Sequence, residues 1–411
     1  MHSSKILIIG AGQAGIYAAS EIRKHDQDSA ITIFGDENYL PYERPPLSKD
    51  FLMNKRKEDE FLFFSKNFFE DNKITFIKEK IKNIDFKKQE LVSVFNKNFS
   101  YDKLLITTGS TNRKMLLGSK IDNEIYYLRN LDDALKIKEK TLKKNKIAII
   151  GGGFIGLEIA SSFNQLNKEV NLIEISNQLM GRIIPPSIAN IVKNQHEKHG
   201  NKIQMDSKIR DIQKNHHGYK IFLENDTLIE AEIIIAGIGS KPSVSLFNYS
   251  DLEIENGIVT DEYCQTSIEN VYAAGDVANF YHPLFKKKLR LESYQHAQNH
   301  GINAGKNIAG IKTQYLSIPW MWSDQFNFNL QLTGICDQYD DVIVRGTTLE
   351  EGIINFFIKN NKIAGACGLG LMGKVGRDIR ISTKLIEKNI TIDKKILLDQ
   401  NVKLNLLMKN L

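Results

Sequence analysis

The sequence predicts an α/β protein in which one strand–turn–helix unit occurs twice, followed by a separate α+β segment at the C-terminus. The first copy reads KILIIGAGQAG at residues 5–15, and the second reads KIAIIGGGFIG at residues 146–156. When residues 5–22 are aligned with residues 146–163, nine of the eighteen positions are identical. Each copy is an apolar run, then glycines, then a helical pattern, which is typical of a buried strand, a tight turn and a helix.

The glycines of both copies occupy the positions of a GxGxxG fingerprint. The first glycine forms the turn, the second lets the backbone approach a pyrophosphate, and the third lets the helix pack on the strand. The free N–H groups at the helix N-terminus complete a phosphate site. A single match is also what an ordinary glycine turn produces, whereas two matches in the same context favour two dinucleotides. The fingerprint residues are Gly10, Gly12 and Gly15 in the first copy and Gly151, Gly153 and Gly156 in the second.

An acidic residue follows each fingerprint at roughly 20 residues, the distance at which a carboxylate binds a ribose hydroxyl. In the first copy the second strand, residues 31–34, is followed by Asp36, and in the second copy residues 170–173 are followed by Glu174. Two dinucleotides in one chain imply hydride transfer between a flavin and a nicotinamide.

Later segments complete both units and begin a third. The first unit closes with a buried strand and glycine loop at residues 103–109, and the second closes with a matching run at residues 233–239. Residues 266–276 then form a short strand that places Asp276 at its carboxyl end, where ligands of open α/β sheets bind. Beyond a helix at residues 293–308, strands are expected at residues 329–334, 341–345, 352–358 and 362–368, and a helix near residues 376–388.

The composition excludes several classes of protein. The 411 residues include 55 basic and 49 acidic residues, and this mild excess argues against a nucleic-acid binder, which would show a more concentrated basic face. No apolar run reaches the roughly 18 residues of a membrane span, and no signal segment is recognisable, so we expect a cytoplasmic protein without membrane contact. The three cysteines lie far apart and the histidines lack ligand spacing, which predicts neither a dithiol redox centre nor a metal site.

Four longer motifs are much rarer than GxGxxG. They are PYERPPLSK at residues 41–49, GGGFIGLE at 151–158, LRLES at 289–293 and PWMWSDQ at 319–325. With them the chain resembles, over nearly its whole length, the FAD-dependent NADH:ferredoxin reductases of bacterial oxygenase systems. More distantly it resembles glutathione reductase-like flavoproteins and apoptosis-inducing factor.

The resemblance implies two Rossmann-like dinucleotide-binding domains of the glutathione reductase type and a C-terminal α+β domain. The FAD-binding domain would comprise residues 1–110 and 243–317, and the NAD-binding domain would comprise residues 111–242. Residues 318–411 would form a C-terminal interface domain that covers the flavin side.

The resemblance also implies which residues hold FAD. The first fingerprint, including Ala14, would cradle the pyrophosphate, and Asp36 would face the adenosine end, because the usual acid position is Gly35 here. Asp276 would bind the ribityl or phosphate region, and Tyr294 would lie near the flavin ring. The remaining residues expected to line the cofactor are Arg44, Lys49, Ile81 and Arg129.

Lys49 and Glu158 would act in catalysis. In the related reductases such a pair meets beside the reactive nitrogen of the flavin, where the ammonium stabilises the electron-rich reduced flavin and the carboxylate holds the ammonium. The alternative for Glu158 is a solvated glutamate in a first helical turn, favoured by the helix dipole. The helix that starts near Tyr294 would support an anionic reduced flavin, and within it His296 replaces the usual asparagine.

Two further features have both a functional and a plain structural interpretation. Trp320 and Trp322 would share one face of a strand, as an aromatic wall near the flavin or partner, or as hydrophobic core. Lys286, Lys287, Lys288 and Arg290 would form a docking patch for an acidic ferredoxin, or a solvated turn.

The predicted activity is that of a ferredoxin–NAD(+) reductase. NADH would reduce FAD, and the electrons would pass singly to a 2Fe–2S ferredoxin or a rubredoxin, as part of an oxygenase system. The protein would be a monomer or a homodimer. The alternatives are a redox-responsive interaction protein similar to apoptosis-inducing factor, and an NADH oxidase or peroxidase, although the latter would normally have a redox-active cysteine near the flavin.

Overall fold

A computed structural model of the chain describes residues 3–117, 120–181, 183–248 and 250–408. The chain divides into two compact units, each built from segments that are distant in sequence. Unit 1 comprises Met1–Glu43, Glu58–Thr111 and Ser240–Ser317, and unit 2 comprises Arg44–Lys57, Asn112–Gly239 and Ile318–Leu411. The structure thus joins the segment around Lys49 to unit 2, although its neighbours on both sides belong to unit 1.

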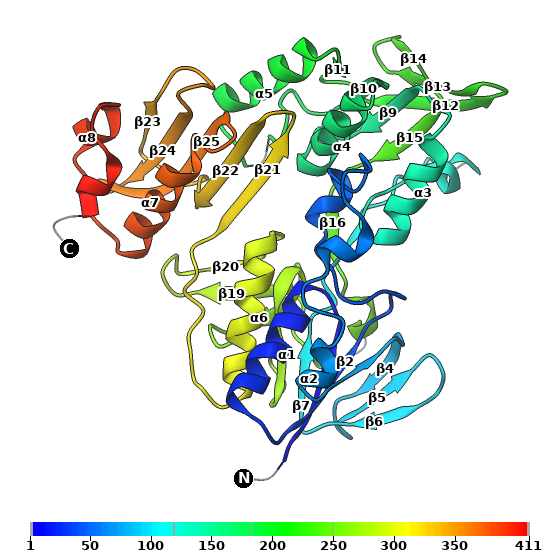
Figure 1. Cartoon of the computed structure of the whole chain (residues 1–411), viewed down its shortest axis with the longest axis vertical. Coiled ribbons are helices and arrows are strands. Elements are labelled where there is room, and N and C mark those ends of the chain that lie inside the picture. The colour runs from blue at the N-terminus through cyan, green and yellow to red at the C-terminus, as the bar shows by residue number, and fades with distance from the viewer. Residues whose placement is uncertain (1–2, 118–119, 182, 249, 409–411) are drawn as a thin grey trace. The chain divides into compact units, whose positions relative to one another are not determined.

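Unit 1 is built on a five-stranded parallel sheet of order β18-β7-β1-β2-β3 (Figure 1). The order reverses beside β1, the first strand of the chain, and ligands of open α/β sheets bind at such a point. The helices α1 (Gln13–His25) and α6 (Tyr294–Ile308) pack against each other. The strands are β1 (Lys5–Ile9), β2 (Ala30–Phe34), β3 (Ile74–Ile77), β7 (Lys103–Ile106) and β18 (Val271–Ala273).

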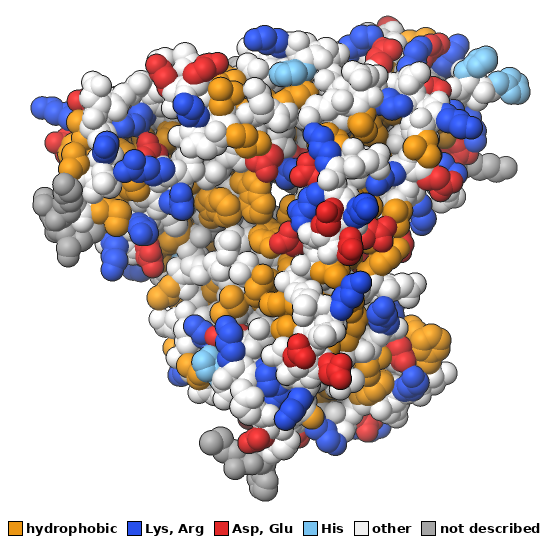
Figure 2. Space-filling view, viewed as in Figure 1, with side chains coloured by type: hydrophobic (Ala, Val, Ile, Leu, Met, Phe, Trp, Pro, Cys, Tyr) orange, Lys and Arg blue, Asp and Glu red, His pale blue; other side chains and the backbone are white. Residues whose placement is uncertain are grey.

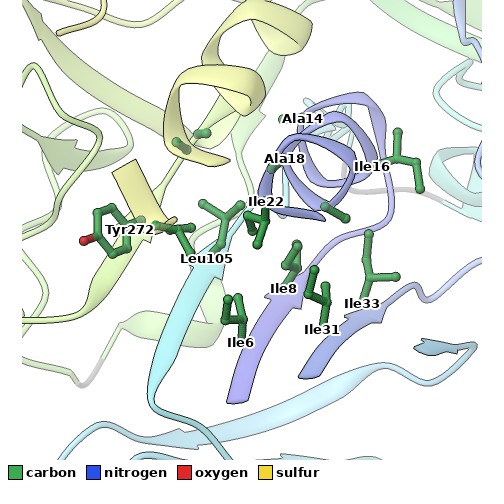
Figure 3. Close-up of a cluster of buried hydrophobic side chains, with 14 of the residues drawn as sticks. Ile6, Ile8, Ala14, Ile16, Ala18, Ile22, Ile31, Ile33, Leu105 and Tyr272 are labelled. Atoms are coloured by element: carbon green, nitrogen blue, oxygen red, sulfur yellow. The ribbon is translucent and has the colours of Figure 1, made fainter. Parts of the chain in front are cut away.

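Both faces of this sheet are buried, because alternate residues of each strand enter different clusters. Ile6 and Ile8 of β1 belong to the cluster that packs under α1, where Figure 3 shows them with Ile22 of the helix. Leu7 and Ile9 enter the cluster on the opposite face. Parallel strands covered on both sides are expected to be continuously apolar, which is why KILII was recognisable as a strand.

Two small sheets complete unit 1. One contains β4 (Ile81–Asp85), β5 (Glu90–Ser93) and β6 (Asn98–Ser100), and the other contains β17 (Ile258–Thr260), β19 (Ala278–His282) and β20 (Lys287–Leu289). A short helix, α2 (Phe68–Asp71), precedes β3. Where the chain passes between the units, β8 (Ser110–Asn112) pairs with β16 (Ser240–Pro242).

Unit 2 contains a second parallel sheet, of order β11-β10-β9-β15, that repeats the first at smaller size. Its strands are β9 (Lys146–Ile150), β10 (Glu169–Ile173), β11 (Lys202–Gln204) and β15 (Ile233–Ala236). The helices are α3 (Leu131–Thr141), α4 (Phe154–Gln165) and α5 (Pro186–Lys198). An antiparallel sheet adds β12 (Ile209–Asn215), β13 (Gly218–Leu223) and β14 (Leu228–Ala231).

The last part of unit 2 is a five-stranded antiparallel sheet of order β21-β22-β25-β24-β23. Its edge strand β21 (Trp320–Gln325) contacts α4, and α7 (Gly376–Glu387) packs on β25 and β22. The other strands are β22 (Phe328–Gly334), β23 (Asp341–Arg345), β24 (Ile353–Lys359) and β25 (Lys362–Leu371), and α8 (Lys394–Leu398) follows α7.

The predicted fold class is confirmed: two parallel dinucleotide-type sheets are followed by an α+β segment. The helix expected at residues 293–308 is α6. Ser293 is its N-cap, and the Ser293 hydroxyl oxygen accepts from the main-chain N–H of His296 at 3.3 Å. The three-domain division remains a prediction. Among the described residues, none of the helices is long and apolar enough to cross a membrane.

Arg345, at the end of β23, anchors the C-terminal segment. Arg345 is 8% exposed, and its guanidinium donates to five main-chain carbonyls. They belong to Ile396, Leu397, Asp399, Gln400 and Val402, at 2.8 to 3.3 Å. The last turn of α8 and the loop after it therefore satisfy these carbonyls with one buried cation.

Arg345→Met should lower the free energy of unfolding by about 2 kcal/mol, because it removes the donor of one buried and four partly buried carbonyls. Hydrogen exchange should increase first in residues 396–402. Chemical denaturation of the purified protein measures the first effect, and exchange mass spectrometry measures the second. Arg380→Met, on the exposed face of α7, is the control and should change neither.

Candidate active site

The first glycine fingerprint forms a tight turn that only glycine permits. Gly10 has a φ of +109°, and a Cβ there would lie 2.3 Å from the carbonyl oxygen of Thr107. A Cβ on Gly15 would lie 2.0 Å from the carbonyl oxygen of Gly10, so α1 begins directly against the end of β1. A Cβ on Gly12 would meet nothing within 4 Å, which leaves open space at the start of the helix.

The second fingerprint repeats this geometry in unit 2. Gly151 has a φ of +103°, and a Cβ there would lie 2.5 Å from the carbonyl oxygen of Gly237. A Cβ on Gly156 would again lie 2.0 Å from the carbonyl of the first glycine, and one on Gly153 would meet only a carbonyl at 4.0 Å. The internal duplication therefore extends from the sequence to the backbone conformation.

Both turns fit the pyrophosphate of a dinucleotide. Gly12 and Gly153 are the N-caps of α1 and α4, and neither helix start has a side-chain cap. Their first N–H groups therefore face open space, as an anion site requires. In unit 1 the Nε2 atom of Gln13, the first residue of α1, is buried without a partner among the described residues. A phosphate or ribose oxygen would satisfy such a donor.

Glu174 lies at the carboxyl end of β10, beside the second fingerprint. Its carboxylate accepts from the main-chain N–H of Gly152 at 2.6 Å and from that of Ser176 at 2.8 Å. These two bonds fix the carboxylate next to the glycine turn, which is the position required for a ribose contact. Arg182, the first cation after Glu174 in the sequence, lies outside the described residues.

The structure brings Asp276 and Ala14 to the same end of the sheet in unit 1. Asp276 lies in the turn after β18 and accepts from the Ser110 hydroxyl at 3.0 Å. Ala14 is 6% exposed, and a Cβ on Gly301 of α6 would lie 2.2 Å from its carbonyl oxygen. Ala14 therefore permits close packing of α1 and α6 and contacts a ligand, if at all, through its backbone.

Asp36, Ile81 and Tyr294 have different surroundings. Asp36 is exposed just after β2, whereas Ile81 is buried in a core cluster, so any contact it makes to a nucleotide would come from its main chain. The phenol of Tyr294 donates to Glu43 at 2.8 Å. Burial and that carboxylate raise the pKa of Tyr294, so it stays neutral.

His296 is a buried residue of α6. It is 3% exposed and stacks on Phe280 with ring centroids 5.0 Å apart. Its Nδ1 lies 2.9 Å from the hydroxyl of Tyr315. Burial lowers the pKa of His296 to about 4, so the ring is neutral where the resemblance leads one to expect an amide.

In unit 2, Arg44 and Arg129 lie together. The guanidinium of Arg44 donates to the main-chain carbonyl of Arg129 at 2.6 Å. This bond holds the start of the short 3₁₀ helix at Pro45–Ser48, which carries Lys49 at its C-cap.

Lys49 and Glu158, which the resemblance pairs, form a buried ion pair. The Nζ of Lys49 lies 3.1 Å from Oε1 of Glu158, and their side chains are 15% and 5% exposed. Glu158 also accepts from Ser48 at 2.5 Å and from Ser323 at 2.7 Å. The plain alternative, a solvated glutamate in the first turn, is excluded by this burial.

Trp320 and Trp322 share one face of β21, as predicted, and their rings stack with centroids 5.2 Å apart. The Nζ of Lys49 lies 5.8 Å from the ring centroid of Trp322. The indole of Trp322 donates to Asp324 at 3.0 Å, and this carboxylate lies 3.9 Å from Lys49. The tryptophans therefore line the lysine site and are not fully buried core.

The basic loop at β20 is paired with acidic neighbours. Lys288 contacts Glu255 at 2.9 Å and Glu253 at 3.4 Å, and Arg290 pairs with Glu292. On the face that Figure 2 shows, Lys and Arg side chains are interspersed with Asp and Glu. The positive field of the loop is weaker than its sequence suggests.

Sequence reasoning missed the serines that bind Glu158. Ser48 lies in the motif PYERPPLSK and Ser323 in PWMWSDQ, but neither was assigned a role. A signal was available: in β21 the residues alternating with the tryptophans, Ser323 and Gln325, are polar and also buried. Polar side chains on the buried face of a strand need partners.

The fold and the two glycine turns define an oxidoreductase built to hold two dinucleotides. The family model of the pyridine nucleotide-disulphide oxidoreductases matches residues 4–301, and that of the reductase C-terminal domain matches residues 320–408. The chain therefore belongs to the pyridine nucleotide-disulphide oxidoreductases, within the group of ferredoxin and rubredoxin reductases of oxygenase systems.

The similar proteins agree in length as well as sequence. A 3-phenylpropionate/cinnamic acid dioxygenase ferredoxin–NAD(+) reductase component from Photorhabdus laumondii is 33% identical, covering 94% of this chain and 97% of the relative. A rubredoxin–NAD(+) reductase from Ectopseudomonas oleovorans is 32% identical, covering 85% and 92%. The solved putidaredoxin reductase–putidaredoxin complex matches with a TM-score of 0.94 at 25% identity, covering 100% of this chain and 99% of that one. Membership of this family implies that FAD and a nicotinamide nucleotide bind.

Proposed function

We propose that this chain is an NADH-dependent flavoprotein reductase that passes electrons through FAD, one at a time, to a 2Fe–2S ferredoxin or a rubredoxin of an oxygenase system. The observation that carries the proposal is the buried pair of Lys49 and Glu158 in a chain with two matching phosphate cradles. The names of the similar proteins support both kinds of acceptor and do not favour one.

FAD, when bound, supplies the chemistry: it accepts a hydride equivalent and releases electrons singly. The first fingerprint would hold its pyrophosphate, with Asp276 at the same end of the sheet. The second fingerprint and Glu174 would hold NADH. Lys49 would place a positive charge where reduced flavin accumulates electron density, and Glu158 with its two serine donors would keep that ammonium in place.

The test is acceptor turnover by the FAD-loaded protein. We expect NADH-dependent reduction of a 2Fe–2S ferredoxin or rubredoxin to be fast and oxygen consumption to be slow. Slow turnover of every acceptor would favour an interaction protein, and fast oxygen consumption would favour an oxidase. Burial raises the pKa of the Cys264 and Cys367 thiols well above the ordinary value, which disfavours the reactive thiolate that a peroxidase needs.

NADH should be preferred over NADPH. The carboxylate of Glu174, fixed by two main-chain N–H groups, would accept from ribose hydroxyls and repel a 2′-phosphate. Glu174→Ala should reduce the ratio of kcat/KM for NADH to that for NADPH by about tenfold, and steady-state kinetics with both nucleotides measures it. Comparable efficiency of the unaltered protein with both would refute the assignment. Glu169→Ala, on the same strand but exposed, is the control.

The proposal includes docking of an acidic acceptor on the basic loop. The ion pairs of Lys288 and Arg290 reduce the positive charge that is available for it. Exposed charges are screened beyond about 8 Å at physiological ionic strength, so a docking role requires ferredoxin reduction to slow as salt rises. Replacing Lys286, Lys287, Lys288 and Arg290 by glutamine should lower ferredoxin reduction about threefold, while ferricyanide reduction is unchanged. An unchanged ferredoxin rate with the same salt dependence would place docking elsewhere.

A further inference from the structure

A chain of buried hydrogen bonds leads away from Glu158 through unit 2. The Ser323 hydroxyl binds Glu158, and the Nε2 of Gln325 lies 3.0 Å from the oxygen of Ser323. The Oε1 of Gln325 lies 2.8 Å from Nε2 of His196 in α5. The Nδ1 of His196 lies 2.9 Å from the amide of Asn201, which in turn lies 3.1 Å from Asn164 in α4.

The chain has a single possible direction once Glu158 is a carboxylate. Glu158 faces three donors and so can only accept, which commits the Ser323 proton to it. The Ser323 oxygen must then accept from the amide nitrogen of Gln325, whose oxygen is left to face His196. His196 must therefore carry its proton on Nε2 and accept at Nδ1.

The polar side chains that form this hydrogen-bond chain are almost fully buried. Ser323 and His196 are 0% exposed, Gln325 is 1% and Asn201 is 3% exposed. Burial lowers the pKa of His196 to about 4, so the ring is neutral, as the one-way chain requires. Each donor is aimed toward the same carboxylate oxygen that Lys49 contacts, because Ser323 and Lys49 both bind Oε1.

We propose that Ser323, Gln325 and His196 are positioning residues that withdraw the negative charge of Glu158 from Lys49 and so leave the ammonium available to the reduced flavin. The inference rests on the proposed function and adds to it three residues outside the ion pair. A purely structural role, tying β21 to α4 and α5, would require the same bonds but would leave the flavin potential unchanged.

Ser323→Ala removes a donor from Oε1, so Lys49 must compensate that oxygen alone. The equilibrium constant for two-electron reduction of the bound flavin should fall about tenfold. This is the smaller end of the effect seen when a metal ligand loses its hydrogen-bond partner. A decrease of about tenfold corresponds to a midpoint potential about 30 mV lower. Ser323→Thr, which keeps the hydroxyl, should restore the potential. Ser382→Ala is the matched control, because this equally buried serine donates to the Asp378 carbonyl in α7.

Redox titration of the FAD-loaded variants gives the potential, and ¹⁵N NMR of labelled protein gives the tautomer of His196. We expect the Nε2–H tautomer of His196 in the unaltered protein. Of the three serine variants, Ser323→Ala alone should have a lowered flavin potential. An Nδ1–H tautomer, or a wild-type potential in Ser323→Ala, overturns the proposal. If Ser323→Ala does not fold, Gln325→Met serves instead, with a smaller decrease expected and an unchanged potential again decisive against it. Failure of the proposed function is separate, because NADH would then fail to reduce the flavin of the unaltered protein.

Discussion

Lys49→Met should slow reduction of the bound flavin by NADH between about 100-fold and 1000-fold, the range observed when one preorganised charge or donor is removed from a developing anion. FAD should remain bound, because the first glycine turn, which would hold its pyrophosphate, lies in unit 1, whereas Lys49 lies in unit 2. The loss should affect the rate of the chemical step more than the affinity for NADH, since the charge is needed most after reduction. Stopped-flow absorbance of the flavin measures the rate directly.

The pair of Lys49 and Glu158 permits a sharper form of this test. If Glu158 acts only through the lysine, then Glu158→Gln should cost much less in the Lys49→Met background than alone, which a double-mutant cycle detects. Lys193→Met is the control: this lysine also forms an ion pair, with Glu197 at 2.7 Å, but on the solvent side of α5. Unchanged flavin reduction in Lys49→Met would remove the proposed role.

The parts of the fold that could be predicted from the sequence are those that a local pattern determines. The parallel strands are continuously apolar because both faces are buried, and the glycines of the two turns are required by backbone contacts within their own units. The strand at Asp341–Arg345 was predicted with its observed bounds, because residues typical of turns flank it in the sequence. These features depend on neighbours in sequence, which a single chain displays.

The parts that escaped prediction depend on contacts between distant segments. The serine donors of Glu158 come from residues 110 positions before and 165 positions after it, and no local pattern links them. Helices α3 and α5 were not assigned from the sequence. The sequence left both interpretations of the basic loop open, because the acidic partners of Lys288, Glu253 and Glu255, lie on a separate segment more than thirty residues earlier. These ion pairs offset part of the positive charge of the loop.

The free energy of unfolding should fall steeply as the pH is lowered from about 6.5 to about 4, because two histidines are buried in the neutral form. Burial lowers the pKa of both His196 and His296 from 6.5 to about 4. Between these values the unfolded chain binds protons that the folded chain does not, so stability rises with pH in this window and is lost as the pH falls. Each histidine can contribute about 3 kcal/mol over the window, against a total of about 5–15 kcal/mol for a typical protein.

Proton uptake on unfolding near pH 5.5 isolates this effect, because ordinary carboxylates are still ionised there in both states. Calorimetry in buffers of different ionisation enthalpy should find close to one proton taken up for His196 and one for His296. His282 and His300, whose pKa values burial also lowers, should contribute further. His196→Gln and His296→Asn should each remove about one proton from this uptake.

The two substitutions also address different parts of the molecule. His196 belongs to unit 2, where its Nε2–H donates to Gln325 and its Nδ1 accepts from Asn201. His296 belongs to unit 1, where its titratable neighbours are Asp276, His282, His300 and Tyr315. Acid should therefore destabilise both units, and each variant should flatten the pH dependence of its own unit alone, as hydrogen exchange resolved along the chain would detect. If the uptake near pH 5.5 is close to zero, the buried histidines are already protonated in the folded protein, and the one-way hydrogen-bond chain to Glu158 is wrong as well, because a protonated His196 has no acceptor to offer Asn201.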